Sequence, residues 1–227
     1  MEWQVGLTTV PERRYAELSS ALRSLRQGGF TGIRLFVDGD CSESDYASLG
    51  LQCTFRKPRI RAWGNWWLGF QELFIRNPNA DRYIMFQDDI TCVRNLRQYL
   101  EQSPYPENGY CNLVTYQQND NPDSRGWYRT TGWRGLGAQA LMFDQHAAVT
   151  LLTQQMDDWT LRPKDLKRGH QGIDGAIALK METFGVHEFV HSPSLVTHVG
   201  DESTLGHRQQ VMSESFPGED FDAMELL

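Results

Sequence analysis

Two adjacent carboxylates follow an apolar run in the stretch YIMFQDDI, which covers residues 83–90. The apolar residues predict a buried strand, and Gln87, Asp88 and Asp89 come directly after it. Two negative charges at the mouth of a hydrophobic strand cost desolvation free energy unless a positive group lies beside them. Mg²⁺ or Mn²⁺ would suit, because these cations take oxygen ligands and keep positions open for phosphate oxygens. By itself, the pair is equally typical of a helix N-cap and a solvated turn.

Two other predicted strands end close to polar residues. They cover residues 3–10 and 33–40, and their ends carry Thr8, Thr9, Val10, Asp38 and Asp40. Ligands of open parallel sheets bind beyond the carboxyl ends of the strands. We therefore expect these two ends and residues 87–89 to share one crevice, although Asp38 before Gly39 is also an ordinary turn signal.

Basic and aromatic side chains are concentrated in two further stretches. Residues 55–67, FRKPRIRAWGNWW, contain four cations and three tryptophans, and residues 117–136 are rich in Gly, Asn, Asp, Arg and Trp. The cations could hold a diphosphate or a polyanionic acceptor, and the indoles could stack on sugars or bases. The alternative is a solvated loop leading into a core helix, and a surface loop that binds no ligand.

The elements that must position these residues follow from the apolar periodicity. A strand, a helix and a second strand within residues 3–40 predict a parallel βαβ unit, with Pro11 suited to the start of the helix. Further strands are expected at 83–86, 110–116 and 138–143, and further helices at 66–78, 94–102, 144–156 and 172–185. Residues 117–136 are expected to form a loop, and residues 186–190 and 193–199 short extended segments. No repeat or linker interrupts the pattern, so the sequence predicts one α/β domain over residues 1–227.

The composition argues against several classes of protein. No apolar run approaches the length of a membrane span, and the first ten residues lack the basic region of a signal peptide. The four cysteines show neither CxxC nor zinc-ligand spacing, so we expect reduced thiols and a cytoplasmic location, in a microbe or a virus-infected cell. The net charge is −7, and most of it belongs to an acidic tail from about residue 201 to 227. The charge therefore does not exclude a polyanionic partner.

Four motifs together resemble the glycosyltransferases of the GT-A fold: LTTVPERR, LFVDGD, FQDDI and VTHVGDESTLG. The sequence resembles above all the N-acetylglucosaminyltransferase IV type and related microbial and viral glycosyltransferases, over residues 5 to about 205. The resemblance implies a Rossmann-like, mostly parallel sheet flanked by helices. In such enzymes a DxD variant follows a strand. Here Gln87 replaces its first acid, which leaves Asp89 as the implied metal ligand.

The same resemblance implies a role for each candidate residue. Asp89 and His198 would bind Mn²⁺ or Mg²⁺, and Asp174 would deprotonate the acceptor hydroxyl. The donor would be held by Thr8, Thr9, Val10, Asp38, Asp40, Arg61, Asn65, Gln87 and Asp88, and the acceptor by Trp127, Trp133 and Arg134. From the residues alone, His198 could equally be structural and Asp174 a helix N-cap.

The resemblance implies the transfer of a hexose or N-acetylhexosamine from a nucleotide sugar, expected to be a UDP-sugar, with inversion at the transferred carbon. The expected acceptor is a 5-hydroxymethylpyrimidine in DNA, as in virus-type DNA modification, and the alternative is a glycan or lipid-linked saccharide. Two other classes stay open. One is a Mg²⁺-dependent nucleotidyl or phosphoryl transferase, against which the missing P-loop motif counts. The other is a non-catalytic sugar-binding module.

Overall fold

The computed structural model describes residues 1–121, 123–130, 134–153, 172–199 and 214–227. Within these residues, a central sheet has eight strands, in the spatial order β3 (Gln52–Arg56), β2 (Arg34–Asp38), β1 (Trp3–Thr9), β4 (Arg82–Gln87), β8 (Ala140–Asp144), β6 (Gly109–Asn112), β9 (His187–Ser192) and β7 (Gly126–Arg129). A small second sheet pairs β5 (Ile90–Cys92) with β10 (Val196–His198) in antiparallel fashion.

The central sheet is mixed. β3, β2, β1 and β4 pair in parallel, and β8 lies antiparallel between β4 and β6. β6 pairs in parallel with β9, whose other neighbour is the antiparallel β7. Because β1, β2 and β4 are parallel neighbours, their carboxyl ends meet at one edge, where the register places Thr8 beside Gln87. The predicted α/β fold class, a mostly parallel Rossmann-like sheet flanked by helices, is confirmed.

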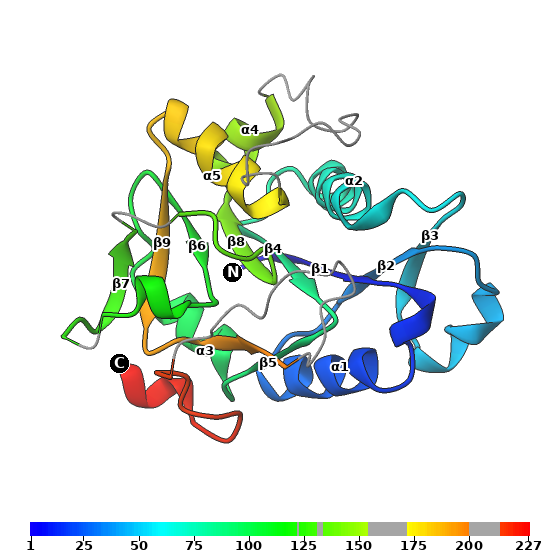
Figure 1. Ribbon diagram of the computed structural model, residues 1–227, viewed down its shortest axis with the longest axis horizontal. Coiled ribbons are helices and arrows are strands. Elements are labelled where there is room, and N and C mark those ends of the chain that lie inside the picture. The colour runs from blue at the N-terminus through cyan, green and yellow to red at the C-terminus, as the bar shows by residue number, and fades with distance from the viewer. Residues whose placement is uncertain (122, 131–133, 154–171, 200–213) are drawn as a thin grey trace.

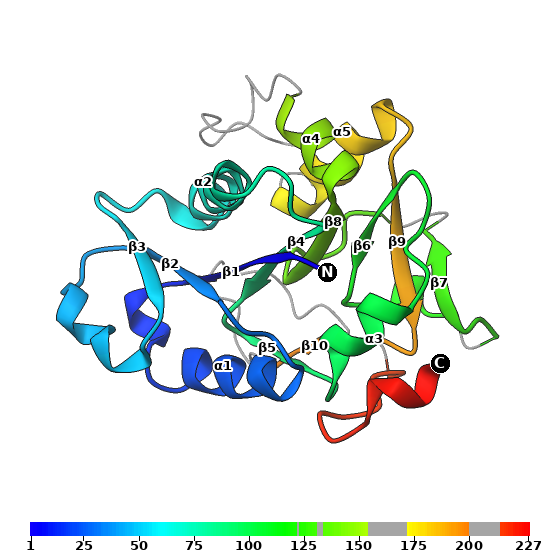
Figure 2. The same cartoon turned by 180° about the vertical axis from the view of Figure 1, so that it is seen from behind.

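Helices cover both faces of the sheet (Figures 1 and 2). On one face lie α2 (Arg61–Arg76), α4 (Gln145–Thr153) and α5 (Ile173–Thr183), and on the other α1 (Glu17–Gln27) and α3 (Leu96–Gln102). Alternate side chains of β4 fill two hydrophobic layers, with Ile84 and Phe86 on the α1 side and Tyr83 and Met85 on the α2 side. Burial on both faces explains why such a strand is a continuous apolar run in the sequence.

Short 3₁₀ helices complete the described chain: η1 (Pro11–Arg13), η2 (Glu43–Asp45), η3 (Ala47–Leu49), η4 (Gln117–Asn119) and η5 (Ala223–Leu226). No helix in the described ranges is long and apolar enough to cross a membrane.

The structure corrects several expected boundaries. Pro11 begins only η1, α1 begins at Glu17, and α2 begins at Arg61 instead of residue 66. β3 and β5 were not predicted, and the strand expected at 110–116 already ends at Asn112. The expected loop 117–136 contains β7, where Trp127 and Tyr128 have high β-propensity and the strand pairs with β9 at the edge of the sheet.

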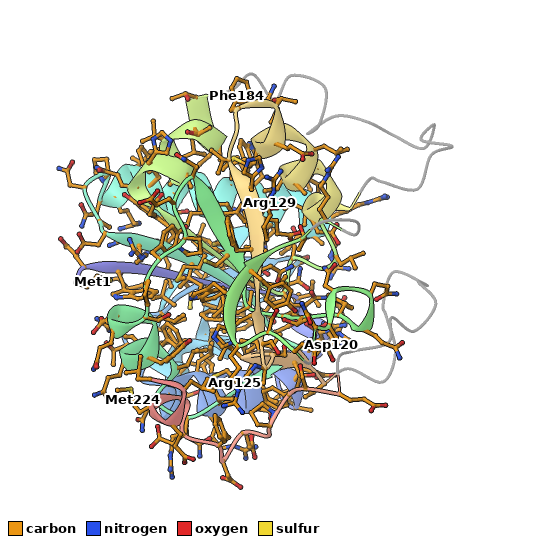
Figure 3. The ribbon with its side chains drawn as sticks, turned by 90° about the vertical axis from the view of Figure 1, so that its left-hand side faces the viewer. Met1, Asp120, Arg125, Arg129, Phe184 and Met224 are labelled. Carbon is orange, nitrogen blue, oxygen red and sulfur yellow. The ribbon has the colours of Figure 1, made fainter. Side chains whose placement is uncertain are left out.

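Residues 214–227, the described part of the expected acidic tail, pack against the α3 face of the sheet. Ala223 is fully buried and its amide donates to the carbonyl of Arg94 at 2.9 Å. The Asp222 carboxylate accepts a hydrogen bond from Asn95 Nδ2 at 2.9 Å. Figure 3 looks onto the β7 edge, with Met224 of this segment and Phe184 at opposite ends of the molecule. This part of the tail is therefore a structural element of the domain.

Candidate functional site

Asp88 and Asp89 lie in the connection between β4 and β5, and both residues are buried, with exposed fractions of 4% and 5%. The positive partner that this burial requires is Arg13 of η1. Its Nη1 lies 2.9 Å from Asp88 Oδ1 and 2.6 Å from Asp89 Oδ2. Sequence reasoning missed Arg13 although the residue belongs to the LTTVPERR motif, because nothing in the sequence shows that the turn after β1 reaches the end of β4.

The two carboxylates differ in their surroundings. Burial raises the pKa of Asp88, although Thr9 Oγ1 donates to its Oδ2 at 2.6 Å and Arg13 lies beside it. Burial also acts on Asp89 in the same direction. There, the hydrogen bonds and charges of His198 and Arg13 together outweigh it and lower the pKa. Asp89 therefore ionises more readily than Asp88.

His198 belongs to β10, where it pairs with Ile90 of β5. Its side chain approaches the carboxylate of Asp89. Its Nε2 lies 3.1 Å from Asp89 Oδ2, and Asp89 Oδ1 is buried with no hydrogen-bond partner within the described part of the chain. Neighbouring ligands of an octahedral cation with bonds of about 2.1 Å lie roughly 3 Å apart, so Asp89 and His198 fit one shared divalent cation.

The described ranges contain no group of three or more His, Cys, Asp or Glu side chains that could enclose a metal by themselves. A cation on Asp89 and His198 would therefore need ligands beyond the side chains of the described residues. Mg²⁺ commonly binds in this way, through one or two carboxylates together with substrate phosphates. The pair fits a cation that is bound together with a diphosphate.

Asp38 is the last residue of β2, Asn65 lies on α2 beside that strand, and both are almost fully buried. Asp38 Oδ1 accepts a hydrogen bond from the Ile60 amide at 2.8 Å, and Asn65 Nδ2 donates to the carbonyl of Phe36 at 2.9 Å. Asp38 Oδ2 and Asn65 Oδ1 have no hydrogen-bond partner among the described residues. Buried acceptors are costly to leave unpaired, so these two oxygens mark positions that donors of a ligand could satisfy.

Three other residues that were expected to bind the nucleotide-sugar donor lie at the same edge of the sheet. Thr8 Oγ1 donates to the carbonyl of Phe86 at 3.2 Å, inside the sheet. Val10 precedes η1 in extended conformation, and the Gln87 amide donates to the carbonyl of Gln139 at 2.9 Å. The structure therefore brings the ends of β1, β2 and β4 together, as the sequence predicts.

The basic stretch 55–67 is largely neutralised within the chain. Arg56 pairs with Glu72 at 3.4 Å, Lys57 with Asp40 at 3.2 Å, and Arg59 with Glu12 at 2.7 Å. Asp40, which was expected to bind the donor, is exposed and forms an ion pair with Lys57 at the surface. Arg61 is exposed at the first residue of α2, where its φ of 67° lies in the left-handed region.

Two of the three tryptophans of the same stretch are not available for stacking on a ligand, and Trp63 is half-buried with its ring edge-on to Trp67. Trp66 and Trp67 are buried, and Trp66 stacks on Phe70 with ring centroids 5.3 Å apart. These two indoles belong to the hydrophobic layer beneath α2.

Asp174 lies in the first turn of α5, and its Oδ2 accepts a hydrogen bond from the Gly137 amide at 2.6 Å. A Cβ on Gly172 would lie 2.1 Å from Asp174 Oδ1, so the glycine leaves room for the carboxylate. The loop that carries Gly137 continues to Gln139, whose carbonyl accepts from the Gln87 amide. Asp174 is thus connected to the end of β4 through one short segment.

Tyr116 provides a second link between Asp174 and the carboxylates of β4. Its hydroxyl donates to Gln139 Oε1 at 3.0 Å. Burial, then the negative charges of Asp174 and Asp89, raise the pKa of Tyr116. Both carboxylates therefore lie within electrostatic range of the same buried hydroxyl.

Glu188 of β9 is a buried acid that sequence reasoning also missed. Its Oε2 accepts a hydrogen bond from the Gly135 amide at 2.7 Å, and its Oε1 accepts one from Asn112 Nδ2 at 3.3 Å. Burial raises the pKa of Glu188 to about 7. Glu188, Asn112 and Asp174 together hold the segment from Gly135 to Gly137, because Asn112 Nδ2 also donates to the Gly137 carbonyl at 3.2 Å.

The expected acceptor residues are less closely connected to the carboxylates. Trp127 lies on β7, four strands from β4 and so roughly 19 Å away in the sheet. Its indole donates to Ser103 Oγ at 3.0 Å and packs edge-on against His191. Arg134 pairs with Glu182 of α5 at 2.6 Å. Trp133 lies outside the described residues.

No protein-family model matches the sequence, and no curated protein matches it. Among solved structures, the chain is similar to a Bacillus anthracis protein described as a glucose-1-phosphate thymidylyltransferase in complex with sucrose. The TM-score is 0.50 and the identity 13%, over 90% of this chain and 92% of that chain. S. aureus TarS matches with a TM-score of 0.47 and 9% identity, over 84% of this chain and 36% of TarS. At 13% identity, the likeness to the first of these two structures shows a shared α/β fold and no function or narrower family.

Proposed function

We propose that this protein is a cation-dependent glycosyltransferase that moves a sugar from a nucleotide sugar, expected to be a UDP-sugar, to an acceptor hydroxyl with inversion. The observation that carries the proposal is the environment of Asp89. This buried carboxylate has one unpaired oxygen within the described part of the chain, and its other oxygen lies 3.1 Å from His198. It lies at the edge where β1, β2 and β4 end.

The residues around Asp89 support donor binding. Mn²⁺ or Mg²⁺ held by Asp89 and His198 would act as a Lewis acid that stabilises the charge of the departing diphosphate. Arg13 adds a positive charge beside the same carboxylates. Asp38 Oδ2 and Asn65 Oδ1 would accept hydrogen bonds from the base or the ribose, because both are buried acceptors with no partner among the described residues.

Asp174 supports the acceptor half of the reaction. Its carboxylate would take the proton of the acceptor hydroxyl as that oxygen attacks the sugar. The Gly137 amide orients the carboxylate through Oδ2, and Gly172 leaves the space that Oδ1 occupies. The segment from Gly137 to Gln139 joins this base to the end of β4, so one short connection would position the donor and acceptor groups.

A 5-hydroxymethylpyrimidine in DNA is the acceptor that we propose to test first, with a glycan or lipid-linked saccharide as the alternative. The sequence favoured DNA because of the basic residues and indoles at 56–67 and 125–134. Arg56, Lys57 and Arg59 are paired with acids, and Arg129 and Arg134 are both paired with Glu182. The support from charge is therefore reduced to the exposed Arg61 and Arg125. Direct analysis of the product must therefore decide the acceptor.

Calorimetric titration with several nucleotides tests the donor site. UDP is expected to bind in the presence of Mn²⁺, and binding should disappear when a chelator is added or when Asp89 is replaced by Asn. Asp81→Asn is the matched control, since Asp81 is an exposed acid just before the opposite end of β4. Binding of UDP that survives both the chelator and the Asp89→Asn substitution would contradict the proposal.

Mass spectrometry of the products separates the reaction types. Incubation with mixed nucleotide sugars should add the mass of one sugar to hydroxymethylated duplex DNA or to one member of a glycan panel. A nucleotidyltransferase would instead release pyrophosphate from a nucleoside triphosphate and a sugar 1-phosphate. A sugar-binding module would produce neither change.

A further inference from the structure

Arg13 contacts the same Asp89 oxygen that lies beside His198. Its Nη1 is 2.6 Å from Asp89 Oδ2, and the same oxygen is 3.1 Å from His198 Nε2. The same nitrogen also donates to Asp88 Oδ1 at 2.9 Å. One guanidinium nitrogen therefore contacts both carboxylates and covers the Asp89 oxygen that a cation would share with the histidine.

The backbone of η1 is held by the neighbours of Arg13. Glu12 pairs with Arg59 at 2.7 Å, and Arg14 pairs with Asp45 at 2.9 Å. The Arg13 amide itself donates to the carbonyl of Val10 at 3.1 Å. The Arg13 side chain can therefore change partner by rotation about its own bonds while the turn stays in place.

The charges determine which partners can coexist. Asp88, Asp89 and Arg13 together carry one net negative charge. A divalent cation beside the partly buried guanidinium would be repelled at short distance, where the effective dielectric is lower than in water. A diphosphate supplies at least two negative charges, which a guanidinium binds in bidentate fashion. The cation and the diphosphate can therefore enter together more readily than the cation alone.

We propose that Arg13 is an internal counter-ion that excludes the cation until a nucleotide diphosphate arrives, and that it then binds the diphosphate. This inference rests on the proposed function. It makes Arg13 a substrate-binding residue and makes the binding of cation and nucleotide mutually dependent. Without nucleotide the cation binds weakly, because it must displace the guanidinium from both carboxylates.

Mn²⁺ binding measured without any nucleotide tests this role, using the electron paramagnetic resonance signal of free Mn²⁺. Arg13→Gln keeps much of the side-chain length and removes the charge, so Mn²⁺ alone should bind at least about tenfold more tightly than to the wild type. With Mn²⁺ saturating, UDP should bind about tenfold more weakly to the variant, since a charged diphosphate contact is lost. Arg14→Gln removes the neighbouring charge and should change neither value.

A second variant protects the test against misfolding, because Arg13→Gln leaves two buried carboxylates without their counter-ion. Arg13→Gln with Asp88→Asn removes one charge of each sign and keeps Asp89 and His198, so it should fold and still bind Mn²⁺ alone more tightly than the wild type. Unchanged or weaker Mn²⁺ binding by this double variant overturns the role of Arg13, while chelator-sensitive UDP binding by the wild type would leave the proposed function standing. Absence of Mn²⁺ binding in all variants, with and without UDP, overturns both.

Discussion

The carboxylate of Asp174 accepts a hydrogen bond from the Gly137 amide at 2.6 Å, although the two residues are 37 positions apart. Gly137 has a φ of 77°, and an added Cβ would lie 2.3 Å from the Tyr116 hydroxyl. The loop is therefore closely packed between α5 and the end of β4. This contact gives the proposed base a defined orientation relative to Asp89.

Asp174→Asn tests the base directly. Asparagine retains an oxygen that can accept from the Gly137 amide, but it cannot take up a proton at neutral pH. The turnover number should fall about 100- to 10,000-fold while UDP binding with Mn²⁺ is unchanged. Steady-state kinetics and calorimetry measure the two quantities. Asp144→Asn is the matched control, because Asp144 accepts from the Ala147 amide at 2.7 Å at the start of α4 and has no role in the proposed reaction.

Gly172→Ala should reduce turnover, and only because it displaces the carboxylate of Asp174. The new Cβ would overlap Asp174 Oδ1 at 2.1 Å, so the carboxylate must rotate away from its present orientation. Misplacement of a catalytic group by about 1 Å can cost on the order of 100-fold in rate. A double-mutant cycle checks the cause: Gly172→Ala combined with Asp174→Asn should be no slower than Asp174→Asn. Additive losses would mean that the alanine acts elsewhere.

Asp89→Asn and His198→Gln should each weaken Mn²⁺ binding measured in the presence of UDP. Each substitution removes one of the two proposed protein ligands, and Asp89→Asn also removes a buried charge that attracts the cation. We expect a loss of at least about tenfold for each, and loss of turnover on chelation that added Mn²⁺ restores in the wild type. His146→Gln, an exposed histidine on α4, should behave as the wild type. Retained Mn²⁺ affinity in both variants would exclude these ligands.

Glu188 should make stability depend on pH. Its pKa is about 7 in the folded protein, above the ordinary 4.5, so the folded state holds the proton more tightly than the unfolded chain. Its contribution to stability is therefore complete below pH 4.5 and is lost as the pH rises through about 7. The loss amounts to about 3 kcal/mol, taking 1.36 kcal/mol for each unit of pKa difference.

Urea denaturation of the wild type and of Glu188→Gln, between about pH 4.5 and pH 8, measures this contribution. Glutamine keeps hydrogen-bonding groups near Gly135 and Asn112 but does not ionise, so the free energy of unfolding should shift in favour of the variant as the pH rises. The comparison between variants also removes the opposite trend from buried His191, whose pKa burial lowers to about 4. Glu107→Gln, at an exposed acid, should show the same pH dependence as the wild type.

The local pattern of the sequence was sufficient for the main elements and for the shared edge of the site. The apolar run before Gln87 predicts a strand buried on both faces, and a strand, helix and strand within 40 residues predict parallel neighbours. Parallel neighbours end at the same edge, so Thr9, Asp38 and Asp89 could be placed together without coordinates. The burial of Asp88 and Asp89 also required a positive partner, although not a particular one.

Only the tertiary structure decided which charges meet. Arg13 and Asp89 are 76 residues apart, and their contact depends on the turn after β1 folding over the end of β4. The pairing of Arg59 with Glu12, the burial of Glu188 and the position of Trp127 on an edge strand likewise depend on strand order. Apolar periodicity acts within one element and can be followed along the chain. Ion pairs and buried polar contacts join elements that are distant in sequence, so their partners are chosen only when the chain is packed.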